Sequence, residues 1–103
     1  MQQPREAIWK FPLRRELGGA IQRIQSPYII HVLCIQWQGN EPVMWARVMP
    51  DAAKRPFVIV SYGTGDIFTT QTSAYLGTVQ APDGDAIHYF SGCDSLFLNN
   101  QLD

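Results

Sequence analysis

The stretch that decides the fold is residues 28–48, which read Tyr28-Ile29-Ile30-His31-Val32-Leu33-Cys34-Ile35-Gln36-Trp37-Gln38-Gly39-Asn40-Glu41-Pro42-Val43-Met44-Trp45-Ala46-Arg47-Val48. Two runs rich in β-branched and aromatic residues flank a short polar break. The break carries a Gly-Asn pair, which is typical of a β-hairpin turn. We therefore expect strands over 28–37 and 42–49 that pair antiparallel.

The apolar pattern of these two strands predicts where they lie. The run 28–37 is apolar at both odd and even positions, which predicts a central strand covered on both faces. In the run 42–49, alternate residues share a face of the strand. The more uniformly apolar set should point into the core, namely Met44, Ala46 and Val48.

Prolines and glycines cut the rest of the chain into pieces too short for ordinary helices. The expected strands are 7–13, 20–25, 28–37, 42–49, 57–62, 74–80 and 85–91. A turn at Ala81-Pro82-Asp83-Gly84 should join the last two strands. We expect one all-β domain over 7–92, either a small antiparallel barrel or a sandwich, with a flexible N-terminus 1–6 and a C-terminal tail 93–103.

Composition excludes some classes of protein. The chain has 103 residues, of which 46% are hydrophobic and 17% charged, and this argues against disorder. Its net charge of −1 disfavours nucleic acid as a partner. The first residues lack the pattern of a secretory signal, and no apolar run is long enough to span a bilayer. We expect a cytoplasmic protein without a membrane partner, with Cys34 and Cys93 as free thiols.

Residues that could support catalysis or metal binding are scattered. His31 and Cys34 are three positions apart on one strand, so they should project to opposite faces. His31 is expected in the core with a hydrogen-bond partner, and His88 is expected to be half-buried. Cys93 could fold back to His88, although a structural thiol is the simpler interpretation.

Other catalytic signals are equally weak. Asp83 and Asp85 flank the predicted turn and could form a carboxylate pair, although aspartates in turns commonly bond to their own backbone. The sequence has no Gly-x-Ser-x-Gly, His-Glu-x-x-His or Cys-x-x-Cys motif. We expect no metal, no cofactor and no enzymatic activity.

The best candidate for a binding site is Gly63-Thr64-Gly65, at the end of the strand 57–62. Amides beside glycine can hold a phosphate, and Thr64 adds a hydroxyl. The motif lacks the lysine and the following helix of a P-loop, so a purely structural turn stays the alternative. If the ligand is a nucleotide, we expect positive charge from Arg47, Lys54 and Arg55 beside this turn. Tyr62 or Trp45 would stack on the base.

Two further segments could contact a partner. The polar, Thr-rich loop 66–73 contains two apolar residues that we expect to be exposed, Ile67 and Phe68. Loops of this kind on a rigid β-scaffold often carry binding. The tail contains Leu96-Phe97-Leu98, which either folds back or meets a partner.

Five motifs, taken in order, resemble a family of small proteins of unknown function from bacteriophages and prophages. They are Ile8-Trp9-Lys10-Phe11-Pro12-Leu13, Val43-Met44-Trp45-Ala46-Arg47-Val48, Gly63-Thr64-Gly65, Tyr75-Leu76-Gly77-Thr78-Val79-Gln80 and Ile87-His88-Tyr89-Phe90. Similar proteins often have leucine at the position of Arg47 and histidine at that of Asp66. The resemblance implies a phage setting, in which small proteins commonly act by binding.

These observations lead to three functional hypotheses. The first is a non-enzymatic, homo-oligomeric phage protein in the host cytoplasm that antagonises antiviral defence. It would sequester a nucleotide-type signal or cap a host defence protein. The second is a structural protein, such as a virion accessory or protein-interaction domain. The third is a small hydrolase that depends on His88.

Overall fold

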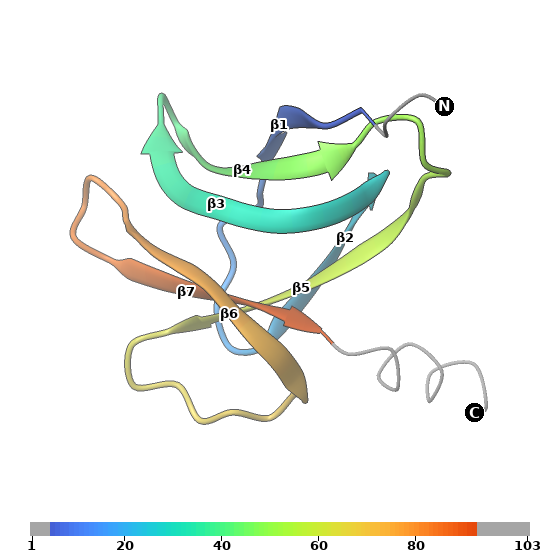
Figure 1. The fold of residues 1–103 in the computed structure, drawn as a ribbon. Helices are drawn as coiled ribbons and strands as arrows, with labels where there is room; N and C mark the ends of the chain where they lie inside the picture. The colour runs from blue at the N-terminus through green and yellow to red at the C-terminus, as the bar shows by residue number, and fades with distance from the viewer. Residues whose placement is uncertain (1–4, 93–103) are drawn as a thin grey trace.

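The computed structural model describes residues 5–92 and forms an all-β domain (Figure 1). Its strands are β1 (Ala7–Pro12), β2 (Ala20–Ser26), β3 (Tyr28–Gln38), β4 (Glu41–Met49), β5 (Arg55–Gly63), β6 (Thr72–Gln80) and β7 (Ala86–Gly92). Each expected strand is confirmed, with ends that differ by no more than two residues. Residues 1–4 and the predicted tail 93–103, which includes Cys93 and residues 96–98, lie outside the described residues. Within residues 5–92, no helix could cross a membrane.

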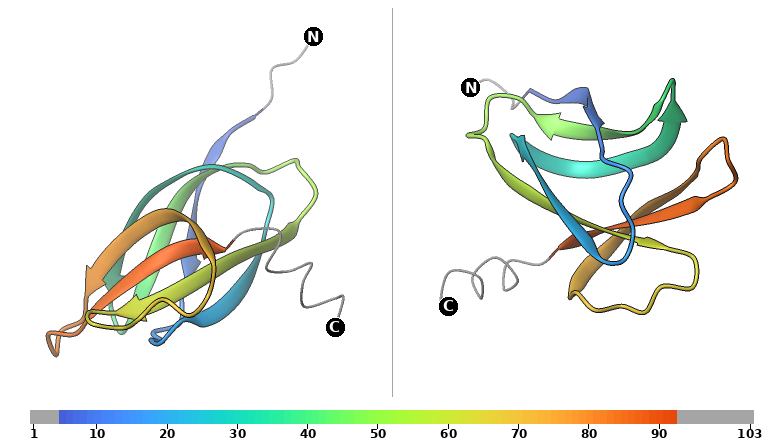
Figure 2. Two further views of the ribbon diagram at one scale, coloured as in Figure 1. Left: turned by 90° about the horizontal axis from the view of Figure 1, so that it is seen from below. Right: turned by 180° about the vertical axis from the view of Figure 1, so that it is seen from behind.

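The strands form two antiparallel sheets that pack face to face. One sheet has the order β1-β4-β3 and the other the order β2-β5-β7-β6. Figure 2 shows the two layers from below and from behind. No ladder joins the two sheets within residues 5–92, so the fold is a sandwich and not the closed barrel that the sequence left open.

Buried side chains from both sheets fill the space between the layers. The chain crosses from β2 to β3 at Pro27, which is fully buried and whose carbonyl accepts a hydrogen bond from the Ser26 hydroxyl at 2.7 Å. The first sheet contributes Phe11, Ile35, Met44, Ala46 and Val48, and the second contributes Ile59, Val79, Ile87 and Tyr89. The expectation that Met44, Ala46 and Val48 point inward is confirmed, since each is completely buried.

The expectation that strand 28–37 is central and covered on both faces is wrong. β3 is an edge strand of the first sheet, and Tyr28 and Leu33 are 59% and 43% exposed. Its register against β4 shifts between Ile29 and His31 and again between Val32 and Cys34. Each irregularity inserts a residue and reverses the alternation. The inward residues, Ile29, Val32 and Ile35, therefore follow one another at intervals of three.

The same irregularities change the positions of His31 and Cys34. His31 pairs with Arg47 and Cys34 with Trp45, and these two β4 residues share a face because they are two positions apart. His31 and Cys34 thus lie on the same outer face, and the expectation of opposite faces is wrong. His31 is exposed, so the expectation of a core histidine is also wrong.

Both predicted hairpin turns are confirmed. Gly39 begins the β3–β4 turn with φ of +64°, as in a type II′ turn. In the β6–β7 turn, the Gly84 N–H donates to the Ala81 carbonyl at 2.9 Å and the Ala81 N–H donates to the Asp85 carbonyl at 2.8 Å. Gly84 has φ of +97°, a value that favours glycine.

Candidate functional site

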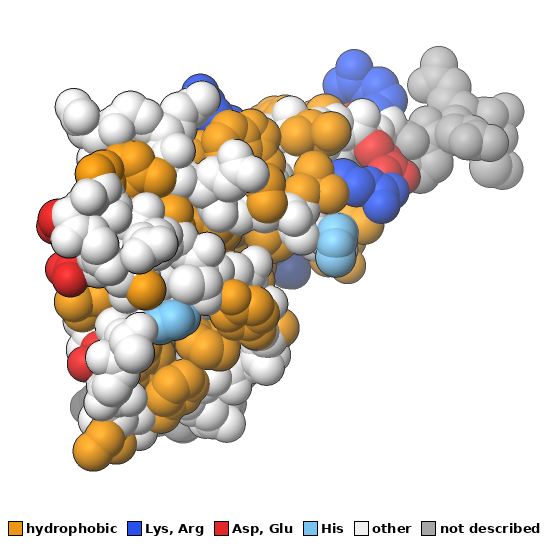
Figure 3. Space-filling model, turned by 90° about the vertical axis from the view of Figure 1, so that its left-hand side faces the viewer, with side chains coloured by type: hydrophobic (Ala, Val, Ile, Leu, Met, Phe, Trp, Pro, Cys, Tyr) orange, Lys and Arg blue, Asp and Glu red, His pale blue; other side chains and the backbone are white. Residues whose placement is uncertain are grey.

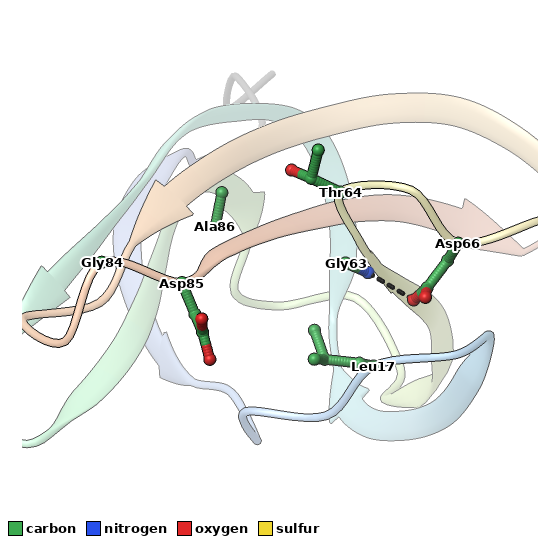
Figure 4. A pocket seen from close by; sticks show the side chains of 7 residues that line it. All are labelled: Leu17, Gly63, Thr64, Asp66, Gly84, Asp85 and Ala86. Carbon is green, nitrogen blue, oxygen red and sulfur yellow. Dashed lines mark hydrogen bonds between the residues drawn. The ribbon is translucent and has the colours of Figure 1, made fainter.

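Three connections meet at one end of the sandwich: the β1–β2 loop, the β5–β6 loop and the β6–β7 turn. Between them lies a shallow pocket of about 270 Å³. Figure 4 shows the residues that line it, which are Leu17, Gly63, Thr64, Asp66, Gly84, Asp85 and Ala86. The sequence prediction of a site at the glycine turn therefore falls on the wall of a pocket.

The glycine turn is closed by its own carboxylate. The Asp66 N–H donates to the Gly63 carbonyl at 3.1 Å, and Gly65 has φ of +93°. Asp66 Oδ2 accepts hydrogen bonds from the Gly63 N–H at 2.6 Å and from the Gly18 N–H at 2.8 Å. These two backbone donors hold the pKa of Asp66 below its usual value. Asp66 thus ties the β5–β6 loop to the β1–β2 loop.

This arrangement is unfavourable for a phosphate. The Gly63 N–H, one of the amides expected to hold an anion, already bonds the Asp66 carboxylate. The pocket lining contains two carboxylates, Asp66 and Asp85, and neither lysine nor arginine. A phosphate at the turn would have to displace one negative group and lie near another.

The basic and aromatic residues predicted for nucleotide binding do not gather at the turn. Lys54 precedes β5 and Arg55 begins it, whereas Gly63 ends it; nine extended residues place these ends about 26 Å apart. Arg47 and Trp45 lie on β4 in the other sheet, on its outer face, where Arg47 pairs with Glu6. The structure therefore brings only part of the predicted set together.

Tyr62 is adjacent to the turn but is only 1% exposed. Its ring stacks on Phe68 with centroids 4.1 Å apart. Its hydroxyl accepts hydrogen bonds from the Thr69 and Thr70 N–H groups, at 3.1 and 2.9 Å, and donates to the Thr70 carbonyl at 3.1 Å. Tyr62 holds the β5–β6 loop against the sheet, so its faces are not open to a nucleobase.

The β5–β6 loop is held at Asp66 and at residues 68–70, yet it exposes apolar side chains. The Thr70 hydroxyl donates to the Gly19 carbonyl at 3.3 Å, and Phe68 packs edge-on against Phe90 at 5.1 Å. Ile67 is nevertheless 82% exposed and Phe68 54%, as the sequence predicted for these two residues. The loop therefore presents apolar surface from a backbone that hydrogen bonds tie to β5 and to the β1–β2 loop.

A chain of hydrogen bonds that the sequence did not predict runs across the outer face of the second sheet. Thr64 Oγ1 lies 2.9 Å from His88 Nε2, Thr78 Oγ1 lies 2.9 Å from His88 Nδ1, and the Tyr75 hydroxyl lies 2.6 Å from Thr78 Oγ1. His88 is half-buried, as expected. The Thr78–His88 contact could have been found from the β6–β7 turn, which sets their register. The Thr64 contact depends on the pairing of β5 with β7.

The Thr64 hydroxyl lies within hydrogen-bond distance of the His88 imidazole, which is the contact through which a histidine activates a hydroxyl nucleophile. A hydroxyl, Thr78, takes the place of the carboxylate that orients histidine in hydrolytic triads. His88 does not line the pocket. No group of three or more metal-ligating side chains occurs within residues 5–92.

The predicted roles of Asp83 and Asp85 are confirmed in part. Asp83 Oδ1 accepts a hydrogen bond from the Asp85 N–H at 3.1 Å, so it does bond its own turn. Both carboxylates also bind Arg15, at 2.7 and 3.0 Å, and the Arg15 guanidinium lies 5.6 Å from the Trp37 ring centroid. The Arg15 contact holds the pKa of Asp83 below its usual value. These contacts join the β1–β2 loop to the β6–β7 turn.

Comparison with known proteins supports a resemblance to a family of unknown function, and it carries no information on a phage setting. The chain belongs to a family described as a domain of unknown function (DUF7352), which it matches over residues 4–95. No curated protein and no solved structure matches the chain.

Proposed function

We propose that this chain is a non-catalytic binding protein that recognises a protein partner through the surface formed by Ile67, Phe68 and Tyr75, here called the loop face. The observation that carries the proposal is an isoleucine that is 82% exposed on a loop fixed by side-chain and backbone bonds. Phe68 and Tyr75 both contact Phe90, at 5.1 and 5.5 Å, so the three aromatic rings form one continuous surface.

Order in the free protein favours this surface as a binding site. A flexible loop would lose conformational entropy when its partner bound, whereas an ordered one loses little. Large exposed apolar and aromatic side chains on a fixed backbone are typical of interface anchors. Tyr75 and Phe68 therefore have both the exposure and the support of such anchors, since they are 61% and 54% exposed.

The charges near the loop face indicate the chemistry of the partner. Asp66 directly precedes Ile67, and Asp85 lies across the pocket. Figure 3 shows the left-hand side of the molecule in Figure 1, where hydrophobic side chains are spread among uncharged ones, acidic side chains lie along the left margin, and lysine or arginine side chains lie toward the top and right. We expect a partner that offers an apolar groove bordered by lysine or arginine.

The wider setting follows from the phage resemblance and is part of the proposal. The protein would act in the cytoplasm of an infected bacterium and cap a host defence protein. Capping is favoured over sequestration of a nucleotide because Asp66 occupies the Gly63 amide and Tyr62 is buried. Calorimetry against cyclic and linear nucleotides should give no heat of binding, and measurable heat from any of them would support sequestration instead.

Site-specific photo-crosslinking tests the proposal. A photo-reactive amino acid at position 67 in cells that contain the partner should give one dominant adduct with a cytoplasmic protein. The same group at position 33 is the control, because Leu33 is also exposed but lies on β3 of the other sheet. The adducted protein, purified, should bind the wild type and Leu33→Ser equally and Ile67→Ser at least about tenfold more weakly.

Two results would contradict the proposal. One is equal crosslinking from positions 67 and 33, which would indicate random encounters. The other is unchanged affinity in Ile67→Ser. An adduct with a virion protein, in place of a cytoplasmic one, would support the structural hypothesis.

A further inference from the structure

β1 is an edge strand whose second edge has no partner within residues 5–92. It pairs only with β4, in a regular antiparallel register from Ala7 opposite Val48 to Pro12 opposite Val43. An unpaired regular edge can pair with another strand, and most proteins protect such edges.

The ladder with β4 shows which residues of β1 face the open edge. The Leu13 N–H donates to the Pro42 carbonyl at 2.9 Å, which continues the same register. Backbone groups alternate between the two edges of a strand, so Phe11, Trp9 and Ala7 also face β4. Glu6, Ile8 and Lys10 therefore direct their N–H and C=O groups outward. Pro12 follows in the same series and has no N–H, which ends the open row.

The other sheet edges are less suitable for pairing. β3 and β6 each have two register shifts, which interrupt a regular row of donors and acceptors. Along β2, the Arg14 guanidinium donates to the Ile21 carbonyl at 3.3 Å, and the Gln22 side chain bonds both backbone groups of Arg14. β1 combines regularity with an edge that these described contacts leave uncovered.

We infer that β1 pairs antiparallel with β1 of a second copy of this chain, with Ile8 opposite Ile8 at the two-fold axis. In this register Glu6 lies opposite Lys10 of the second copy, and Lys10 lies opposite its Glu6. On the outer face, the two Ile8 side chains, each 64% exposed in the single chain, make an apolar contact at the centre. A Glu6–Lys10 ion pair lies on each side of this contact. About six backbone hydrogen bonds form, and the two three-stranded sheets become one continuous sheet.

The alternative registers are less favourable. A centre at Lys10 places two lysines opposite each other, and a centre at Glu6 places two glutamates opposite each other, which is destabilising. A centre at Trp9 places Lys10 opposite Ile8, without any charge pair. Of these registers, only the one centred on Ile8 both pairs the outward backbone groups of the two strands and places each Glu6 opposite a Lys10.

Charge reversal and mixing give the sharpest test. Glu6→Lys places like charges at both ends of the interface, and so does Lys10→Glu, so each variant alone should dimerise at least about tenfold more weakly than the wild type. An equimolar mixture of the two should form a heterodimer, because each lysine then meets a glutamate. The double variant Glu6→Lys/Lys10→Glu should recover the homodimer. Sedimentation velocity compares these four samples with the wild type.

Disulfide trapping tests the register, in a background with Cys34→Ser and Cys93→Ser. Ile8→Cys should oxidise to a covalent dimer, since opposed Cα atoms in such a pair lie about 5.5 Å apart. Lys10→Cys should not, because the two copies of position 10 lie about 13 Å apart along the strands. A monomeric wild type at about 100 µM, a mixture that stays monomeric, or equal trapping at both positions would overturn the inference.

The two variants used for charge reversal alter only exposed positions, and their thermal unfolding should be checked against the wild type. Glu6→Lys also removes the contact of Glu6 with Arg47. Lys10→Glu removes instead the Lys10 bond to Gln38, at 3.1 Å. Recovery of the dimer in the mixture cannot come from either lost contact, so it separates pairing from a change in the fold.

Discussion

Removing a single oxygen atom from Tyr62 tests how firmly the β5–β6 loop is held. In Tyr62→Phe the ring can keep its stacking on Phe68, but the loop loses three hydrogen bonds, to the Thr69 N–H, the Thr70 N–H and the Thr70 carbonyl. Each such bond contributes about 0.5–1.5 kcal/mol net. Because water can replace the hydroxyl as a partner of the loop backbone groups, we expect the free energy of unfolding to fall by about 2 kcal/mol in total.

The loss should be visible in two measurements. The midpoint of thermal unfolding should fall by roughly 10 °C, as expected for a domain of this size. Hydrogen exchange at the Thr69 and Thr70 amides should become about 30-fold faster. Tyr28→Phe is the matched control, since Tyr28 is 59% exposed, and it should change neither quantity. A Tyr62→Phe variant with wild-type midpoint and wild-type exchange would refute the reasoning.

Three further predictions concern pH and the core. The Gly63 and Gly18 N–H groups lower the pKa of Asp66, so this carboxylate stabilises the fold above its unfolded pKa and the contribution is lost as the pH falls below about 4. In a plot of the thermal unfolding midpoint against pH, Asp66→Asn should therefore show a smaller decrease at acidic pH than the wild type. Burial raises the pKa of Tyr89 to about 12, so the phenol ionises more readily in the unfolded chain and the free energy of unfolding should fall as the pH rises above about 10. Chemical denaturation at alkaline pH should show a smaller fall in Tyr89→Phe than in the wild type. The Ser61 hydroxyl is buried without a hydrogen-bond partner among the described residues, so Ser61→Ala should raise the free energy of unfolding by about 0.5–1 kcal/mol in urea titration, and a loss of stability would contradict this.

The strand pattern was readable from the sequence because local rules govern it. Proline and glycine mark the ends of the strands, and Gly39 and Gly84 in the two hairpin turns have positive φ angles, which glycine favours. The inward face of β4 followed from simple alternation. β3 was misplaced because alternation fails where a strand carries an irregularity, and an apolar residue at each inserted position makes an edge strand resemble a central one.

The glycine turn that the sequence singled out lines a pocket, but the contacts around it were not predicted. Asp66 follows the glycine turn directly, yet its bond to the Gly18 N–H joins residues 48 positions apart and depends on how the loops meet. Tyr62 was expected to stack on a ligand because aromatic exposure cannot be read from a single position. The contact between Thr64 and His88 likewise depends on pairing between β5 and β7, which no local pattern fixes.

The central claim is that Ile67 is exposed on a loop that is ordered before any partner binds. Backbone ¹⁵N relaxation of the free protein measures this most directly, residue by residue. We expect order parameters near 0.85 for residues 66–70, equal to those of the strands β5 and β7. Values below about 0.6 for these residues, with rigid strands on either side, would contradict the account.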